Sequence, residues 1–438
     1  MAGRQGSRKT VNATPETLRA ARHTPSPQRD ACIARDRADP LAPLRDRFTL
    51  PEGEIYLDGN SLGAMPGSAP SAMDEALDRG WARGLIRSWN AEGWHMLPVT
   101  VGDRLAPLMG ASPGEVLVAD STSVNLYKLF CAAMRLRPGR AGVISERNNF
   151  PTDVHILQGA TASMFEGARL ALAGDDDQSV LALIDADTAV VCLSHVNYRT
   201  GRLRDMAAIT RAAHEAGALV IWDLAHSLGA LPVDLNGCKA DFAVGCSYKY
   251  LNGGPGAPAW LFVAARHLDD VASPLTGWQG HAAPFAFDID YQPAATIEKF
   301  RCGTPPILSY LPLVESLAVF EETSMSALRE KSLELTGLFI ELADERLARH
   351  GLAVITPREP GERGSQVALT HAEGWPIMQA LIACGVVGDF RAPDILRFGF
   401  TPLYTSFEDV WGAVATLDAI METGLWREPR FSERKLVT

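Results

Sequence analysis

Short apolar runs alternate with segments of helical spacing between residues 116 and 263, and this alternation restricts the possible folds more than any other feature of the chain. Apolar runs bounded by turn residues are typical of strands buried on both faces, and helices between them predict a mostly parallel sheet. We expect a helix over residues 206–215 that ends at Gly217. The expected strands cover residues 115–119, 142–145, 188–193, 218–222, 242–245 and 260–263. The predicted fold class is α/β.

The 438 residues exceed the roughly 250 to 300 at which a single core stops growing, so we expect two domains. Beyond residue 308 the pattern changes to long helices, notably over 325–349, with strand-like pieces at 366–370 and 395–398. We predict a large domain over 41–310 and a smaller α+β domain over 311–438. Residues 1–40 begin basic and without apolar periodicity, and we interpret them as a mobile extension. An organelle transit peptide is the alternative, although no amphipathic run supports it.

Composition excludes several function classes. The formal net charge of −11 gives no general attraction to nucleic-acid phosphates. No apolar run approaches the roughly 18 residues of a membrane helix, so we expect no membrane span. The 7 cysteines form no C-x-x-C pair, which favours a reducing cytoplasm. The 10 histidines show no H-E-x-x-H spacing, and we expect no metal.

Polar residues follow the expected strands at the edge where α/β sheets bind ligands. Asp223 and His226 come after strand 218–222, and Lys249 comes after strand 242–245. Pyridoxal phosphate needs a lysine for an imine link and an acid that keeps its pyridine nitrogen protonated. Either residue alone has an ordinary interpretation, as a helix cap or a solvated lysine. Together, Lys249 and Asp223 predict this cofactor.

Two further segments can complete such a site. Asp120-Ser121-Thr122-Ser123 precedes a helical stretch, so hydroxyls and free amide groups meet where an anion is stabilised. Serine and threonine also cap helices that bind nothing. Phe150 and Asp153 follow strand 142–145 and can offer an aromatic face and an acid to a planar ring, although phenylalanine is usually core.

Seven motifs in order resemble the kynureninases, a family of fold-type-I pyridoxal-phosphate enzymes related to the aspartate aminotransferase fold. The motifs are YLDGNSLG at 56–63, RSWN at 87–90, FPTD at 150–153, WDLAH at 222–226, SYKYLN at 247–252, GWQGH at 277–281 and RFGFTPLY at 397–404. The resemblance begins near residue 41. It implies hydrolytic cleavage of the Cβ–Cγ bond of L-kynurenine to anthranilate and L-alanine, in tryptophan catabolism.

The resemblance also implies roles for individual residues. Lys249 attaches the cofactor and moves the α-proton, Asp223 pairs with the pyridinium nitrogen, and Tyr248 holds the phosphate and donates a proton. Arg397 binds the substrate carboxylate with two hydrogen bonds, unless it is a surface residue of the small domain. The implied cofactor shell also contains Thr122, Ser123, Phe150, Asp153, Ser194 and His226.

A homodimer is implied as well, with Trp278 and Thr304 reaching the active site of the neighbouring subunit. Trp278 is alternatively an ordinary core residue. Symmetric dimers are also the commonest oligomers without any family argument.

Other enzymes of the same fold type remain alternatives. A cysteine desulfurase needs a reactive cysteine on a mobile loop, and no cysteine lies in such a segment. An aminotransferase stays open on chemistry alone, and it would transfer the amino group to a keto acid instead of releasing anthranilate. A binding protein that lost its activity is an alternative from a different class. It is disfavoured because Lys249, Asp223, Tyr248 and Arg397 are all present.

Substrate selectivity gives a first prediction. Vertebrate-type family members favour 3-hydroxykynurenine and carry a histidine near the position of Trp89 and a Ser-Asn pair in place of Gly303-Thr304. With a bulky indole and without the polar asparagine, this chain is expected to prefer unsubstituted kynurenine while also acting on 3-hydroxykynurenine. Steady-state kcat/KM values with both substrates check this, and equal values would contradict it.

Overall fold

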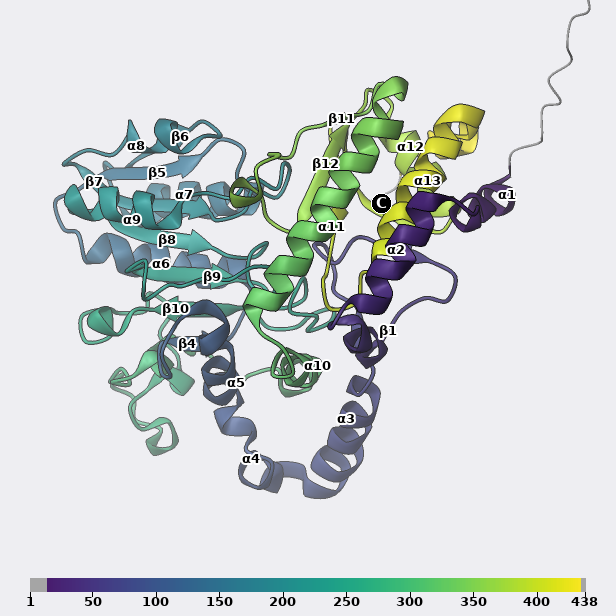
Figure 1. Cartoon of the computed structure of the whole chain (residues 1–438). Coiled ribbons are helices and arrows are strands. Elements are labelled where there is room, and N and C mark those ends of the chain that lie inside the picture. Colours follow the sequence, from purple (N-terminus) through teal and green to yellow (C-terminus); the bar gives the residue numbers. More distant parts are fainter. Residues whose placement is uncertain (1–13, 435–438) are drawn as a thin grey trace, which may run out of the picture.

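The computed structural model describes residues 14–434, and among them seven strands form one sheet at the centre of the larger body (Figure 1). The strand order is β4-β10-β9-β8-β7-β5-β6, with β10 antiparallel to both of its neighbours and the other strands parallel to one another. The predicted mostly parallel sheet is confirmed. Its strands are β4 (Val116–Val118), β5 (Gly142–Glu146), β6 (Arg169–Ala173), β7 (Thr188–Ser194), β8 (Leu219–Asp223), β9 (Phe242–Gly245) and β10 (Trp260–Val263).

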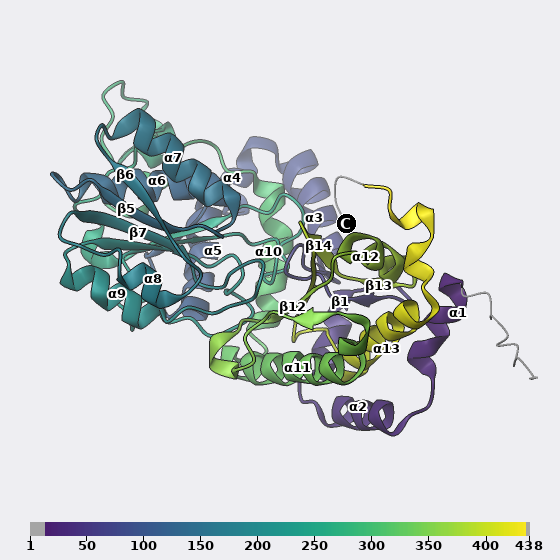
Figure 2. The same cartoon turned by 90° about the horizontal axis from the view of Figure 1, so that it is seen from above.

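Helices cover both faces of this sheet, and Figure 2 shows α6 and α7 on one side with α8 and α9 on the other. Val190 and Cys192 of β7 belong to the core under α6, whereas Val191 and Leu193 belong to the core under α9. Successive strand residues point to opposite faces, so a strand buried on both sides is apolar throughout. The helices are α5 (Leu97–Leu105), α6 (Thr122–Arg135), α7 (Pro151–Met164), α8 (Asp177–Leu181) and α9 (Met206–Glu215).

Strand β6 was not predicted. It is an edge strand whose first residue, Arg169, is exposed and whose middle residues are only partly buried. Its apolar signal is therefore weaker than that of the central strands. The predicted helix end at Gly217 is confirmed, because Gly217 follows α9 with a φ of +81°.

A smaller body contains a four-stranded antiparallel sheet in the order β11-β12-β15-β14. The strands predicted near 366–370 and 395–398 are β12 and β15 of this sheet. Its strands are β11 (Ala353–Val354), β12 (Gln366–Thr370), β14 (Asp389–Arg391) and β15 (Ile395–Gly399). Its helices are α11 (Met325–Arg346), α12 (Gly374–Ala383) and α13 (Phe407–Thr423). Within residues 14–434, no helix combines the length and apolar character needed to cross a membrane.

Segments from the first hundred residues connect the two bodies. β2 (Ile55–Tyr56) pairs with β13 (Val386–Val387) of the smaller body, and α3 (Ala69–Glu75) packs on α10 (Ile307–Phe320). This part of the chain also contains β1 (Phe48–Thr49), β3 (Met65–Pro66) and α4 (Ser88–Ala91). The predicted boundary between residues 310 and 311 stays a prediction. Within α11, Leu328 belongs to the core of the larger body and Leu335 belongs to that of the smaller body.

The interpretation of residues 1–40 as a mobile extension is wrong for residues 14–40, while residues 1–13 lie outside the described part. Helices α1 (Pro15–Arg19) and α2 (Pro27–Ala38) pack beside α13, as Figure 1 shows in purple and yellow. Within α2 only Cys32 is fully buried, and Arg29 pairs with Glu408 at 2.6 Å. Polar contacts hold this helix, which is why apolar periodicity did not reveal it.

Asp36 of α2 gives a prediction for stability. Its carboxylate accepts from the amides of Phe407 and Glu408 at 2.7 and 2.9 Å and so caps the N-terminus of α13. Asp36→Ala is expected to lower the free energy of unfolding by about 1 kcal/mol, because two amides lose their acceptor. Urea unfolding followed by circular dichroism measures this. Asp30→Ala, an exposed acid on the same helix, is the control, and an equal loss there would contradict the capping role.

Candidate active site

A cavity of about 320 Å³ at the carboxyl edge of the large sheet contains most of the predicted site residues. The segments after β4, β5, β7, β8 and β9 all contribute to it, because these strands run in the same direction. Since β10 runs antiparallel, the residues that precede it close the same side. The predicted residues that line the cavity are Thr122, Ser123, Phe150, Asp153, Ser194, Asp223, His226, Tyr248 and Lys249.

The Lys249 amine lies beside an imidazole. Its Nζ is 3.0 Å from Nε2 of His226. Burial and the positive charge of Lys249 lower the pKa of His226 well below its usual range. A neutral imidazole accepts a hydrogen bond from the lysine ammonium. His226 therefore orients the amine without adding a second positive charge to the cavity.

The YLDGNSLG segment packs against the loop that carries Tyr248 and Lys249. The amide of Gly63 donates to the carbonyl of Tyr248 at 2.7 Å. A Cβ on Gly63 would lie 2.3 Å from the carbonyl oxygen of Lys249, far inside van der Waals contact. Any side chain at this position would displace the loop. The last glycine of the motif is therefore a packing requirement of the segment that carries Lys249.

Two buried carboxyl groups meet in the cavity. Asp223, at the end of β8, accepts from the amide of Ala225 at 2.8 Å, and its charge acts on the neighbouring carboxyl of Asp153. Burial raises the pKa of both groups, and the charge of Asp223 raises that of Asp153 further. The charge of Lys249 and the Ala225 amide oppose the rise at Asp223. The pKa of Asp153 is therefore raised further than that of Asp223, so Asp223 is the first of the two to ionise.

The first turn of α6 forms another wall of the cavity. Ser121 caps this helix, since its Oγ accepts from the amide of Val124 at 3.3 Å. Thr122 and Ser123 follow in the first turn and line the cavity. The amides of a first helical turn have no partner inside the helix, and the helix dipole is positive there. This wall is suited to an anionic group such as a phosphate.

An aromatic wall was only partly predicted. The rings of Phe150 and Tyr198 meet edge to face with centroids 5.3 Å apart, and both residues line the cavity. Sequence reasoning missed Tyr198, Cys246 and Thr152. Tyr198 and Cys246 each follow the end of a strand, so the rule that selected Asp223 and Lys249 would have found them. Their ordinary residue types gave no further signal.

Arg397 lies on β15 behind the cavity wall and is buried, so its interpretation as a surface residue is wrong. Its Nη1 donates to the carbonyl of Tyr198 at 2.7 Å, and its Nη2 donates to Oγ of Ser61 at 2.9 Å. It also pairs with Asp389. Its predicted role in binding a carboxylate stays a prediction.

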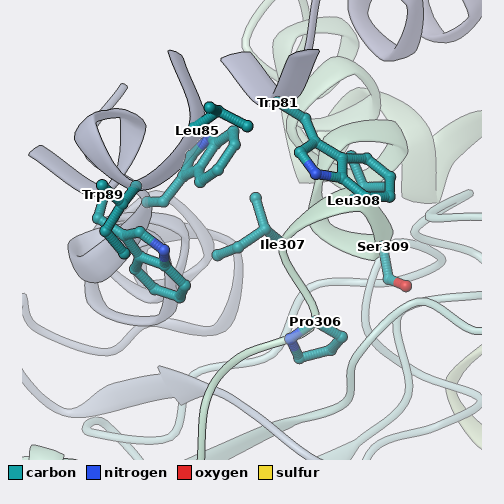
Figure 3. Close-up of a pocket in the computed structure, with 9 residues that line it drawn as sticks. Trp81, Leu85, Trp89, Pro306, Ile307, Leu308 and Ser309 are labelled. Atoms are coloured by element: carbon teal, nitrogen blue, oxygen red, sulfur yellow. The ribbon is translucent and has the colours of Figure 1, made fainter. Parts of the chain in front are cut away.

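The other predicted residues lie outside this cavity. Trp89 lines a second, apolar cavity of about 540 Å³, where Figure 3 shows it with Trp81 and Ile307. Trp278 and Thr304 are exposed and, like Gly303, do not line the first cavity. The interpretation of Trp278 as a core residue is therefore wrong.

Comparison with known proteins finds close relatives. Residues 328–417 match the protein family described as "Kynureninase C-terminal domain". A curated protein named "Kynureninase" from Burkholderia pseudomallei (strain 1106a) is 52% identical over 414 residues, covering 94% of this chain and 99% of that protein. Another "Kynureninase", from Pseudomonas fluorescens, is 50% identical over the same shares of the two chains.

Solved structures with a similar fold are more distant in sequence. The apo cysteine desulfurase from Thermococcus onnurineus NA1 has a TM-score of 0.71 at 19% identity, covering 87% of this chain and 98% of that one. A C-DES mutant with glycine covalently linked to its PLP cofactor has a TM-score of 0.74 at 16% identity, covering 85% and 98%. At these identities the likeness shows the fold alone. It confirms the predicted fold-type-I α/β architecture.

Proposed function

This chain belongs to the kynureninase family, and from that premise we propose that the cavity at the ends of β4, β5, β7, β8 and β9 is its active site, with pyridoxal phosphate bound to Lys249. The enzyme cleaves L-kynurenine hydrolytically to anthranilate and L-alanine and uses pyridoxal phosphate. One observation carries the proposal for the site. Lys249, Asp223 and the first turn of α6 line the same cavity.

The residues of the cavity fit this cofactor. Oδ2 of Asp153 is buried without a hydrogen-bond partner among the described residues, as expected where a polar ligand completes the contacts. Charged Asp223 suits a pyridinium N–H, Phe150 suits the ring face, and the first turn of α6 with Tyr248 suits the phosphate. Ser194 and His226 complete the shell. When bound, pyridoxal phosphate supplies an aldehyde for the substrate amine and a ring that accepts electrons.

Lys249 and Tyr248 handle protons at different substrate carbons. Lys249, once the substrate amine has replaced it, takes the proton from Cα. Cys246 and burial raise the pKa of Tyr248, so the phenol keeps its proton at neutral pH. Tyr248 donates that proton to Cβ, which becomes the methyl group of alanine. Water attacks the γ-carbonyl, and the aromatic part leaves as anthranilate.

We assign substrate binding to four residues that do not line the cavity of their own chain. Arg397 binds the α-carboxylate, for which a planar guanidinium is well suited. Trp89, Gly303 and Thr304 contact the aromatic part of the substrate, and Thr304 also contacts the cofactor. None of these three lines the cavity of its own chain, which favours a contribution from a neighbouring subunit.

The exposed surface around Trp278 supports a homodimer. Trp278 stacks on Phe287, and Phe287 and Ile289 are 77% and 94% exposed. An apolar group this exposed is typical of a protein interface. We also propose a cytoplasmic location, because the seven cysteines are free, and a small-molecule substrate instead of nucleic acid, because the net charge is −11.

Replacement of the lysine tests the proposed function. Lys249→Ala is expected to lose both the yellow absorbance of the cofactor imine and the release of fluorescent anthranilate from kynurenine, because no amine remains to attach the cofactor or to move the α-proton. Lys239→Asn is the control. It removes an exposed lysine with a φ of +57°, which asparagine tolerates. Colour and anthranilate release in Lys249→Ala would refute the assignment, and transfer of the amino group by the parent enzyme would favour an aminotransferase.

Mixed dimers test the shared site. Lys249→Ala and Trp278→Ala homodimers are each expected to be nearly inactive. A mixed dimer, purified with two different affinity tags, is expected to recover about half of the parent activity, because one of its two sites combines an intact Lys249 with an intact Trp278. An inactive mixed dimer, or a parent protein that is monomeric by light scattering, would contradict the arrangement.

A further inference from the structure

A fully buried lysine, Lys128, lies within α6, after the first turn of that helix. Its side chain is 0% exposed. Its ammonium pairs with the carboxylate of Asp120 and donates to the carbonyl of Phe300 at 2.7 Å. Burying an ammonium group is costly unless it is paired and hydrogen-bonded, so these two contacts account for its position.

Asp120 immediately precedes the residues suited to the phosphate. It lines the same cavity as Thr122 and Ser123. Its φ is +51°, a left-handed conformation that non-glycine residues adopt only when their surroundings hold them there. A free carboxylate at this point would repel a phosphate dianion. The ammonium of Lys128 neutralises the charge of the Asp120 carboxylate and holds the turn in place.

Phe300 connects the same lysine to the substrate-binding loop. It ends the short helix Ile297–Phe300, and Gly303 and Thr304 follow within four residues. One ammonium group therefore holds the turn before the phosphate wall and the segment that leads to the predicted selectivity pair.

We propose that Lys128 is a positioning residue for the cofactor phosphate: it neutralises Asp120 and holds the turn that leads into the first turn of α6. The inference rests on the proposed binding of pyridoxal phosphate in this cavity. It extends that proposal to a residue that does not line the cavity.

The test compares two forms of the cofactor that differ only in the phosphate. Apoenzyme is titrated with pyridoxal phosphate and with pyridoxal, and imine absorbance gives the dissociation constant of each. In Lys128→Met the constant for pyridoxal phosphate is expected to rise about tenfold or more, because Asp120 then faces the phosphate without a counter-charge. The constant for pyridoxal is expected to stay within about twofold to threefold of the parent value, because no phosphate is present to be repelled. Equal weakening of both would show a merely structural lysine and overturn the proposal.

A second pair of variants separates charge from packing. Asp120→Asn keeps a residue that tolerates the left-handed backbone and is expected to bind pyridoxal phosphate as tightly as the parent or more tightly. Adding Asp120→Asn to Lys128→Met is expected to restore most of the lost affinity, because both charges are then absent. A double variant as weak as Lys128→Met would refute the role of charge. If Lys128→Met does not fold, the Asp120→Asn variant decides. A tenfold loss of its affinity for pyridoxal phosphate would also refute the role of charge.

These outcomes are distinct from a failure of the proposed function. If the parent apoenzyme forms no coloured complex with pyridoxal phosphate, the cavity is not the cofactor site. If the parent binds it and Lys128→Met retains the parent's ratio of the two dissociation constants, only the inference about Lys128 fails.

Discussion

A buried negative charge at Asp223 is the constraint on which the rest of this structure depends. Burial opposes ionisation there, so the fold must supply stabilising contacts within a few ångströms. The Ala225 amide and the Lys249 charge provide them. The parallel sheet brings these groups together, because strand ends of the same direction meet at one edge. Two charged carboxylates side by side would repel each other, and this repulsion raises the pKa of Asp153.

The YLDGNSLG segment connects this charge centre with the smaller body. Its start pairs with β13, the amide of Gly399 on β15 donates to Leu57 at 2.7 Å, and the amide of Gly63 donates to Tyr248 at the lysine loop. This segment of eight residues thus contacts both the strand of Arg397 and the loop of Lys249. A shift of the smaller body would be transmitted to both groups through backbone hydrogen bonds. This segment therefore helps to fix the position of Arg397 relative to Lys249.

Sequence patterns predicted the central strands and most of the predicted residues that line the cavity, because both follow from patterns of neighbouring residues along the chain. Asp223 and Lys249 were identified from their places after apolar runs, and both lie in the cavity. Edge strand β6 and helix α2 were missed, since their contacts are partly exposed or polar and leave no clear apolar periodicity. Lys128 gave no signal either. A lysine in a helix is usually solvated, and this one is buried because its ammonium contacts Asp120 and the carbonyl of Phe300, which is 172 residues away.

Arg397 shows why geometry adds to motif recognition. A guanidinium has five N–H donors, and here they already serve Tyr198, Ser61 and Asp389. A carboxylate that binds at Nη2 must therefore share or displace one of its two partners there. Asp389 competes directly, because it carries the same chemical group as the incoming ligand. In the absence of substrate, this pairing keeps the buried arginine compensated and correctly oriented. Binding then exchanges one carboxylate for another, so the net electrostatic gain is smaller than for a free arginine. Under the proposed role of Arg397, the benefit of the arrangement is orientation, which would hold the α-carbon of the substrate in a fixed place beside Lys249.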